Sequence, residues 1–147
     1  MIDRVKAALT GAMRSGDRSR VDALRLVLSA LQRGEKTVPV GEFSQADAEA
    51  VLRRERKQRL EAADSYRAAG REDRVAAELA DVPVIEAYLP AAVSEADLAA
   101  LVDAAIQETG AESMRDMGRV MGLVTERSGG RADGRVASAL VRDRLSA

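Results

Sequence analysis

Residues 44–70 read SQADAEAVLRRERKQRLEAADSYRAAG, and they predict one long helix whose two ends are marked. The start is a capping box, in which the Ser44 oxygen accepts a free backbone N–H and the Asp47 carboxylate faces the positive helix end. The helix is predicted to reach Gly70, a residue type that commonly ends helices. A marked helix of this length makes a helical fold the first expectation for the chain.

The segments on both sides of this helix carry the same signals. Apolar residues recur at i, i+3 and i+4, and no segment alternates with the period of two that a strand requires. Further helix starts are predicted at Ser94, Ser113 and Asp133, and Pro83 falls inside a helix, where it removes one backbone hydrogen bond. The sequence therefore predicts an all-α fold of about seven helices.

Pro90 marks the expected boundary between two subdomains, because it closes the fourth predicted helix. We expect an N-terminal lobe of four helices over residues 1–90 and a C-terminal lobe of three helices over residues 91–147. Both lobes are expected to consist of helices alone.

The composition excludes most catalytic chemistry. The 147 residues include no Cys and no His, which rules out disulfides, Cys/His metal sites, thiol nucleophiles and Ser-His-Asp triads. We expect no catalytic residue, no cofactor, no metal and no amidase or ligase turnover by the chain alone.

No apolar run approaches the roughly 20 residues of a membrane helix, and Met1–Arg4 meets charge before a signal peptide could form. We therefore expect a cytoplasmic protein without a membrane partner.

Charge is balanced overall but distributed unevenly along the chain. The formal net charge is −1, so total charge gives no reason to expect a nucleic-acid partner. Residues 75–112 hold eight Asp or Glu and no Lys or Arg, whereas residues 113–147 hold seven Arg against four Asp or Glu. An acidic middle segment is thus followed by a mildly basic end.

The basic end contains the main candidate site, the loop GGRADGR over residues 129–135. Glycines ahead of a helix start, with two arginines four residues apart, suit a phosphate oxygen. The alternative is that Asp133 satisfies the same N–H groups as an ordinary helix cap. The candidate tRNA-binding residues lie in and around this loop: Arg119, Arg127, Arg131 and Arg135.

A second basic group lies in the long predicted helix, where Arg53, Arg56 and Lys57 share one side. These residues are able to contact phosphate, so they form a secondary candidate face. The favoured interpretation is a solvated face of ion pairs, since Glu49 with Arg53, and Glu55 with Arg59, have the favourable i, i+4 spacing.

Two glycines in the sixth predicted helix call for an explanation. Gly118 and Gly122 each cost about 1 kcal/mol relative to Ala in a helix interior. We expect them to allow the backbone of another helix to approach closely, so that Gly122→Leu would destabilise the C-terminal lobe by overpacking.

Five strings occur in an order and spacing that resemble the YqeY family of bacterial proteins. The most specific combination is DMGRVMG over residues 116–122 followed by GRADGR over residues 130–135. The other three strings are ERKQR at 55–59, AGRED at 69–73 and YLP at 88–90. The resemblance covers nearly the whole chain.

This resemblance implies an all-helical fold of two subdomains, similar to the C-terminal part of GatB, a component of the tRNA-dependent amidotransferase. In GatB the corresponding tail recognises tRNA shape, while the kinase and transamidation chemistry lies in other domains. The resemblance therefore implies a helical tRNA-interaction module, with tRNA and a translation or amidotransferase component as partners. Two alternatives stay open: a protein-binding adaptor that uses the acidic middle segment, and a glutamine-dependent carbon-nitrogen ligase activity inherited as a family label.

Overall fold

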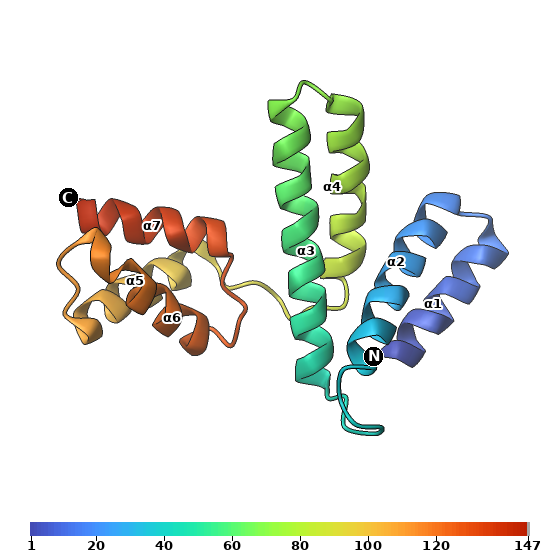
Figure 1. The fold of residues 1–147 in the computed structure, drawn as a ribbon, viewed down its shortest axis with the longest axis horizontal. Coiled ribbons are helices and arrows are strands. Elements are labelled where there is room, and N and C mark those ends of the chain that lie inside the picture. The colour runs from blue at the N-terminus through green and yellow to red at the C-terminus, as the bar shows by residue number, and fades with distance from the viewer. Residues whose placement is uncertain (147) are drawn as a thin grey trace. The chain divides into compact units, whose positions relative to one another are not determined.

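A computed structural model describes residues 1–146, and Figure 1 shows that they fold into helices joined by loops. No strand occurs among these residues, which confirms the all-α prediction. The elements are α1 (Ile2–Ser15), α2 (Arg18–Glu35), α3 (Gln45–Ala68), α4 (Glu72–Glu86), α5 (Glu95–Thr109), the 3-10 helix η1 (Met114–Asp116), α6 (Met117–Arg127) and α7 (Gly134–Ser146). No helix in the described part of the chain is long and apolar enough to cross a bilayer.

The contacts divide the chain into two compact units, which we call the N-terminal unit, Met1 to Leu89, and the C-terminal unit, from Pro90 onward. In the N-terminal unit, α1 and α2 form one helical hairpin and α3 and α4 form another (Figure 1). Its core joins the two hairpins through fully buried side chains, among them Val5, Leu24, Leu31, Leu52 and Ile85.

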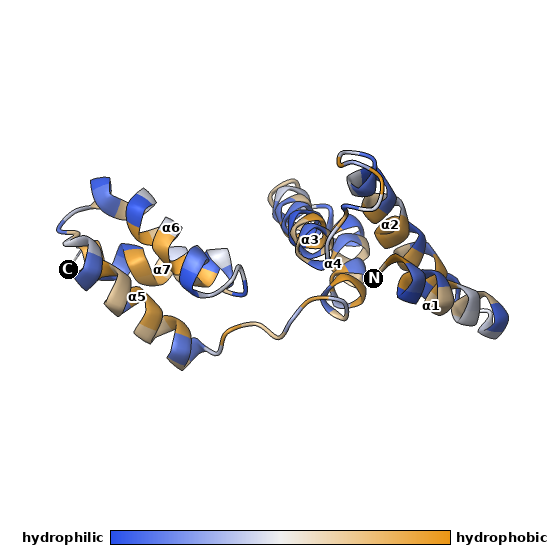
Figure 2. Cartoon of the chain, turned by 90° about the horizontal axis from the view of Figure 1, so that it is seen from below, coloured by the Kyte–Doolittle hydropathy of each residue, from blue (hydrophilic) through white to orange (hydrophobic). Residues whose placement is uncertain are grey.

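The C-terminal unit is a three-helix bundle of α5, α6 and α7. The side chains at its centre are buried because apolar residues of the three helices pack against one another. They are Leu98, Val102, Ala105, Val120, Val124, Ala137 and Val141. Figure 2 colours the apolar residues of these helices orange.

Local capping explains where several helices begin. At α3 the capping box is complete: the Ser44 N–H donates to Asp47 Oδ2 at 2.9 Å, and the Asp47 N–H donates to Ser44 Oγ at 3.1 Å. Hydrogen bonds from Ser44 lower the pKa of Asp47. The box predicted at Ser113 precedes η1, and α6 begins only at Met117, because the first turn is wound more tightly.

The fourth predicted helix ends earlier than expected. α4 runs through Pro83 but ends at Glu86, four residues before Pro90. Beyond that point the Tyr88 and Leu89 N–H groups bond three residues back, to Ile85 and Glu86, so the chain continues as turns.

The expectation for Gly118 and Gly122 was wrong. Both lie on the outer side of α6, and a Cβ added at either would meet nothing within 4 Å. The reason is that α6 faces the core through Val120 and Val124. Close packing occurs instead at Gly34, where a Cβ would lie 2.6 Å from Val51 Cγ2.

Candidate nucleic-acid interface

The loop between α6 and α7 has a fixed conformation. Ser128 is buried and its Oγ donates to the Thr125 carbonyl at 3.1 Å. Gly129 and Gly130 then take φ values of 60° and 74°, which favour glycine. These two residues turn the chain so that the Arg131 carbonyl accepts the Val93 N–H at 3.2 Å, and the loop is thereby joined to the segment ahead of α5.

Arg127 and Arg131 flank this loop and make different contacts. Arg127 Nη2 lies 2.8 and 2.9 Å from the two carboxylate oxygens of Glu108, so its charge is compensated. Arg131 Nε donates to the Ser128 carbonyl at 3.0 Å, a contact that orients the side chain without neutralising it. Arg131 is exposed, and no ion pair with a carboxylate is found for it in the described part of the chain.

Asp133 acts as the cap of α7. Its Oδ1 accepts the N–H groups of Arg135 at 2.9 Å and Val136 at 3.2 Å. Asp133 is therefore an ordinary helix cap, as the alternative interpretation expected. Its carboxylate already accepts the N–H groups that a phosphate would need. The side chain of Arg135 remains on the exposed surface.

Arg119 lies near the other end of α6. Its Nη2 bonds Asp116 Oδ1 at 2.5 Å, while Asp116 Oδ2 accepts the N–H groups of Glu112 at 3.0 Å and Ser113 at 3.2 Å. The Arg119 contact first, and then these N–H groups, lower the pKa of Asp116 to about 2.

The four candidate arginines do not form one pocket. Arg127 and Arg131 line a common surface hollow of about 590 Å³ in the C-terminal unit. Its other lining residues are Ala92, Val93, Ser94, Asp97, Ala100, Leu101 and Ala104. Arg119 precedes Arg127 by eight residues, about 12 Å along the axis of α6, and Arg135 lies in the first turn of α7. The arrangement suits a series of separate phosphate contacts better than a single bound ion.

The secondary basic face on α3 consists of ion pairs. Arg53 bonds Glu49 at 3.2 Å, and Arg56 reaches across to Glu86 of α4 at 2.7 Å. The more exposed Lys57 lies 3.8 Å from Glu61. All three cations thus have carboxylate partners, and the predicted pair of Glu49 with Arg53 is confirmed.

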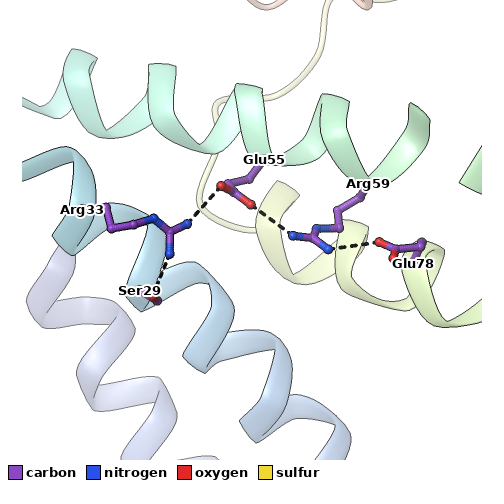
Figure 3. A network of polar contacts seen from close by, with 5 residues as sticks. All are labelled: Ser29, Arg33, Glu55, Arg59 and Glu78. Atoms are coloured by element: carbon purple, nitrogen blue, oxygen red, sulfur yellow. Dashed lines mark hydrogen bonds and ion pairs between the residues drawn. The ribbon is translucent and has the colours of Figure 1, made fainter. Parts of the chain in front are cut away.

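A chain of charges extends from α2 through α3 to α4 (Figure 3). Arg33 donates to Ser29 at 2.9 Å and lies 3.5 Å from Glu55, and Glu55 also pairs with Arg59 at 3.4 Å. Arg59 continues to Glu78 of α4 at 3.1 Å. The predicted pair of Glu55 with Arg59 is confirmed, and the network that contains it joins three helices.

Much of the acidic middle segment is already neutralised. Four of its carboxylates pair with arginines from helices packed against them: Glu78 with Arg59, Glu86 with Arg56, Asp103 with Arg144 and Glu108 with Arg127. The described residues hold no group of three acidic side chains placed to bind a metal ion.

The sequence analysis missed a third basic group, Arg14, Arg18 and Arg20 at the turn between α1 and α2. The available signal was three arginines within seven residues around Gly16 and a single Asp17. Periodicity alone assigns these residues to helix ends and says nothing about whether carboxylates lie beside them.

Comparison with known proteins identifies the family of the chain. A family model described as Yqey-like protein matches residues 2–145. No curated protein matches the chain.

Proposed function

Because the chain belongs to the YqeY-like family, we propose that it is a non-catalytic helical module that binds tRNA by shape and phosphate contacts. It would serve as an accessory to tRNA-dependent amidation or to another step of translation. The similarity of its motifs to the GatB tail suggests this partner, and the surface of the C-terminal unit suggests how the partner is held.

The observation that carries the proposal is the outer side of α6, where Arg119 lies between Gly118 and Gly122. Gly122 weakens the interior of the helix, and a Cβ added at either glycine would meet nothing within 4 Å. A helix face that carries two glycines lets a rigid partner come close to the backbone beside Arg119, as a folded RNA does when its minor groove and sugar-phosphate backbone are recognised by shape.

The exposed arginines supply the attraction for such a partner. Arg119, Arg131 and Arg135 extend from α6 to the first turn of α7, and a guanidinium group binds phosphate oxygens with two parallel hydrogen bonds. Arg119 is already paired with Asp116, so Arg131 and Arg135 carry more of this attraction. Contacts with phosphate position a nucleic acid without selecting its sequence. The proposal therefore requires little preference among different tRNAs.

The adaptor alternative has less support. It needs the acidic middle segment to be available to a basic partner, yet half of its carboxylates are in ion pairs with the chain's own arginines. A ligase activity lacks a supporting site, since the chain has no His or Cys to act as base or thiol nucleophile.

Fluorescence anisotropy with a labelled tRNA across a salt series tests the proposal. Replacing Arg131 and Arg135 together by Ala should lower the log-log salt slope by roughly 1 to 2 and weaken binding to different tRNAs about equally. The matched control is Arg54→Ala with Lys57→Ala, which removes two exposed positive charges from α3. If the Arg131/Arg135 variant binds like the parent with an unchanged slope, the loop is only a helix cap and the proposal is wrong.

A further inference from the structure

The turn between α1 and α2 concentrates positive charge on an exposed surface. Arg14 lies in the last turn of α1, and Arg18 and Arg20 lie in the first turn of α2. All of residues 13–20 are exposed, and Gly16, with a φ of 73°, reverses the chain between the helices. Figure 1 shows this turn at the opposite end of the hairpin from the N terminus. We call Arg14, Arg18 and Arg20 the arginine turn.

The three guanidinium groups of the arginine turn form no ion pair among the described residues, and with Asp17 included the turn carries a net charge of +2. Among residues 1–146, no carboxylate oxygen lies within 4.0 Å of a nitrogen of these three guanidinium groups, which is the largest separation of an ion pair. The nearest acidic residue in sequence, Asp17, caps α2 by accepting the Arg20 backbone N–H at 3.1 Å. Its carboxylate is thus used by the backbone rather than by an arginine side chain.

Helix stability does not explain two of these arginines. The start of a helix carries a partial positive charge, so cations there are unfavourable and acidic residues are preferred. The first turn of α2 nevertheless contains Arg18 and Arg20 and no acidic residue. The positive charges of Arg18 and Arg20 are repelled by the partial positive charge of the helix start, and no ion pair compensates this repulsion.

The turn between α3 and α4 provides a contrast within the same unit. The first turn of α4 contains Glu72 and Asp73, as the helix dipole favours. Two of the arginines around this turn are also paired, Arg67 with Asp64 at 3.3 Å and Arg71 with Asp73 at 3.2 Å, whereas Arg74 has no ion pair among the described residues. Both turns join the helices of a hairpin, but the α3–α4 turn pairs two of its three arginines, whereas the arginine turn pairs none of its three.

We propose that the arginine turn binds the phosphate backbone of RNA. This inference rests on the proposed function for the class of ligand but concerns a different surface, in the N-terminal unit. Three guanidinium groups around one turn supply several forked donors to successive phosphates. The only large apolar side chain among residues 13–20 is Met13, which is too little apolar surface to insert into a lipid membrane.

The test compares two charge-matched variants in the full chain. Arg18→Gln with Arg20→Gln removes charge from the arginine turn, and Arg67→Gln with Arg71→Gln removes the same charge from the paired turn. With labelled tRNA, the first variant should lower the log-log salt slope by roughly 1 to 2, while the second leaves it unchanged. The melting temperature of the first variant should equal or exceed that of the parent, because two charges that oppose the helix dipole are gone.

Each result separates this inference from the proposed function. If only the Arg131/Arg135 variant weakens tRNA binding, the arginine turn is not a contact and the inference is overturned. If only the Arg18/Arg20 variant does so, the inference stands and the assignment of Arg131 and Arg135 is wrong. Absence of tRNA binding by the parent overturns both. If the Arg18/Arg20 variant loses binding to phosphatidylserine vesicles but keeps tRNA affinity, the ligand is a membrane and the inference is also overturned.

Discussion

At the scale of single residues, substitutions at Gly122 should affect the stability of the protein and its tRNA binding differently. It lies on the outer side of α6 with nothing within 4 Å of an added Cβ. Gly122→Ala should therefore raise the free energy of unfolding of the C-terminal unit by about 0.5 to 1 kcal/mol. The larger Gly122→Leu should also keep or raise stability, yet weaken tRNA binding by filling the space the partner needs. Thermal unfolding and anisotropy measure the two effects.

The control for Gly122 is Gly110, where φ is 64° and a side chain is strained. Gly110→Ala should destabilise the protein, because Ala rarely adopts that backbone conformation. A lowered melting temperature for Gly122→Ala would show that the outer side of α6 is packed against other residues. That side would then not be open to tRNA.

Asp116 gives the C-terminal unit a defined pH dependence. Its folded pKa of about 2 lies below the ordinary value of 3.8, because Arg119 and two backbone N–H groups stabilise the carboxylate. The stability from this group is complete above about pH 4 and is lost as pH falls toward 2. Between these pH values the parent should lose more stability than Asp116→Asn. Hydrogen exchange of the α6 amides measures this loss of stability. Equal losses of stability in the parent and in Asp116→Asn would contradict the assignment of the pH dependence to Asp116.

At the scale of elements, Glu55 connects α2, α3 and α4 through Arg33 and Arg59. The Glu55 side chain is only 12% exposed, so its removal leaves Arg59 with one partner in a poorly hydrated place. Glu55→Ala should lower the free energy of unfolding by about 1 to 3 kcal/mol. The control Glu61→Ala removes a pair whose side chains are 75% and 60% exposed and should cost under about 0.5 kcal/mol. Denaturant unfolding compares them, and equal losses would contradict a structural role for the network.

Features set by neighbouring residues could be predicted from the sequence. The caps at Ser44 and Asp133 depend on side chains three residues or fewer from the N–H groups that they bind, so local spacing was enough. The pair of Glu55 with Arg59 was predictable for the same reason. Its extension to Arg33 and Glu78 was not, because that requires knowing which helices lie against α3.

The candidate site was only partly predictable for a related reason. Spacing identified the arginines around the α6–α7 loop but not which of them have carboxylate partners. Arg127 meets Glu108, which is 19 residues away, only after α5 and α6 pack. The outward direction of Gly118 and Gly122 likewise depends on which side of α6 faces the core, and apolar spacing around methionines and glycines did not settle it.

At the scale of the whole molecule, two separate apolar cores predict two separate unfolding events. Leu98 is 2% exposed in the core of the C-terminal unit. Leu98→Ala should cost about 2 to 5 kcal/mol there and speed amide exchange in α5, α6 and α7. The amides of α1 to α4 should keep their protection, since their core is formed by other residues. Equal loss of protection in both units would contradict independent folding.

The most direct test of the central claim is the salt dependence of tRNA binding by the unmodified chain. If arginines on the protein surface hold the RNA through phosphates, log-log plots of affinity against salt should have a slope of roughly −2 to −4. Tests with several tRNAs should give similar affinities, because phosphate contacts carry no sequence information. No measurable binding at low salt, or binding whose affinity does not change with salt, would contradict a tRNA-interaction role for this protein.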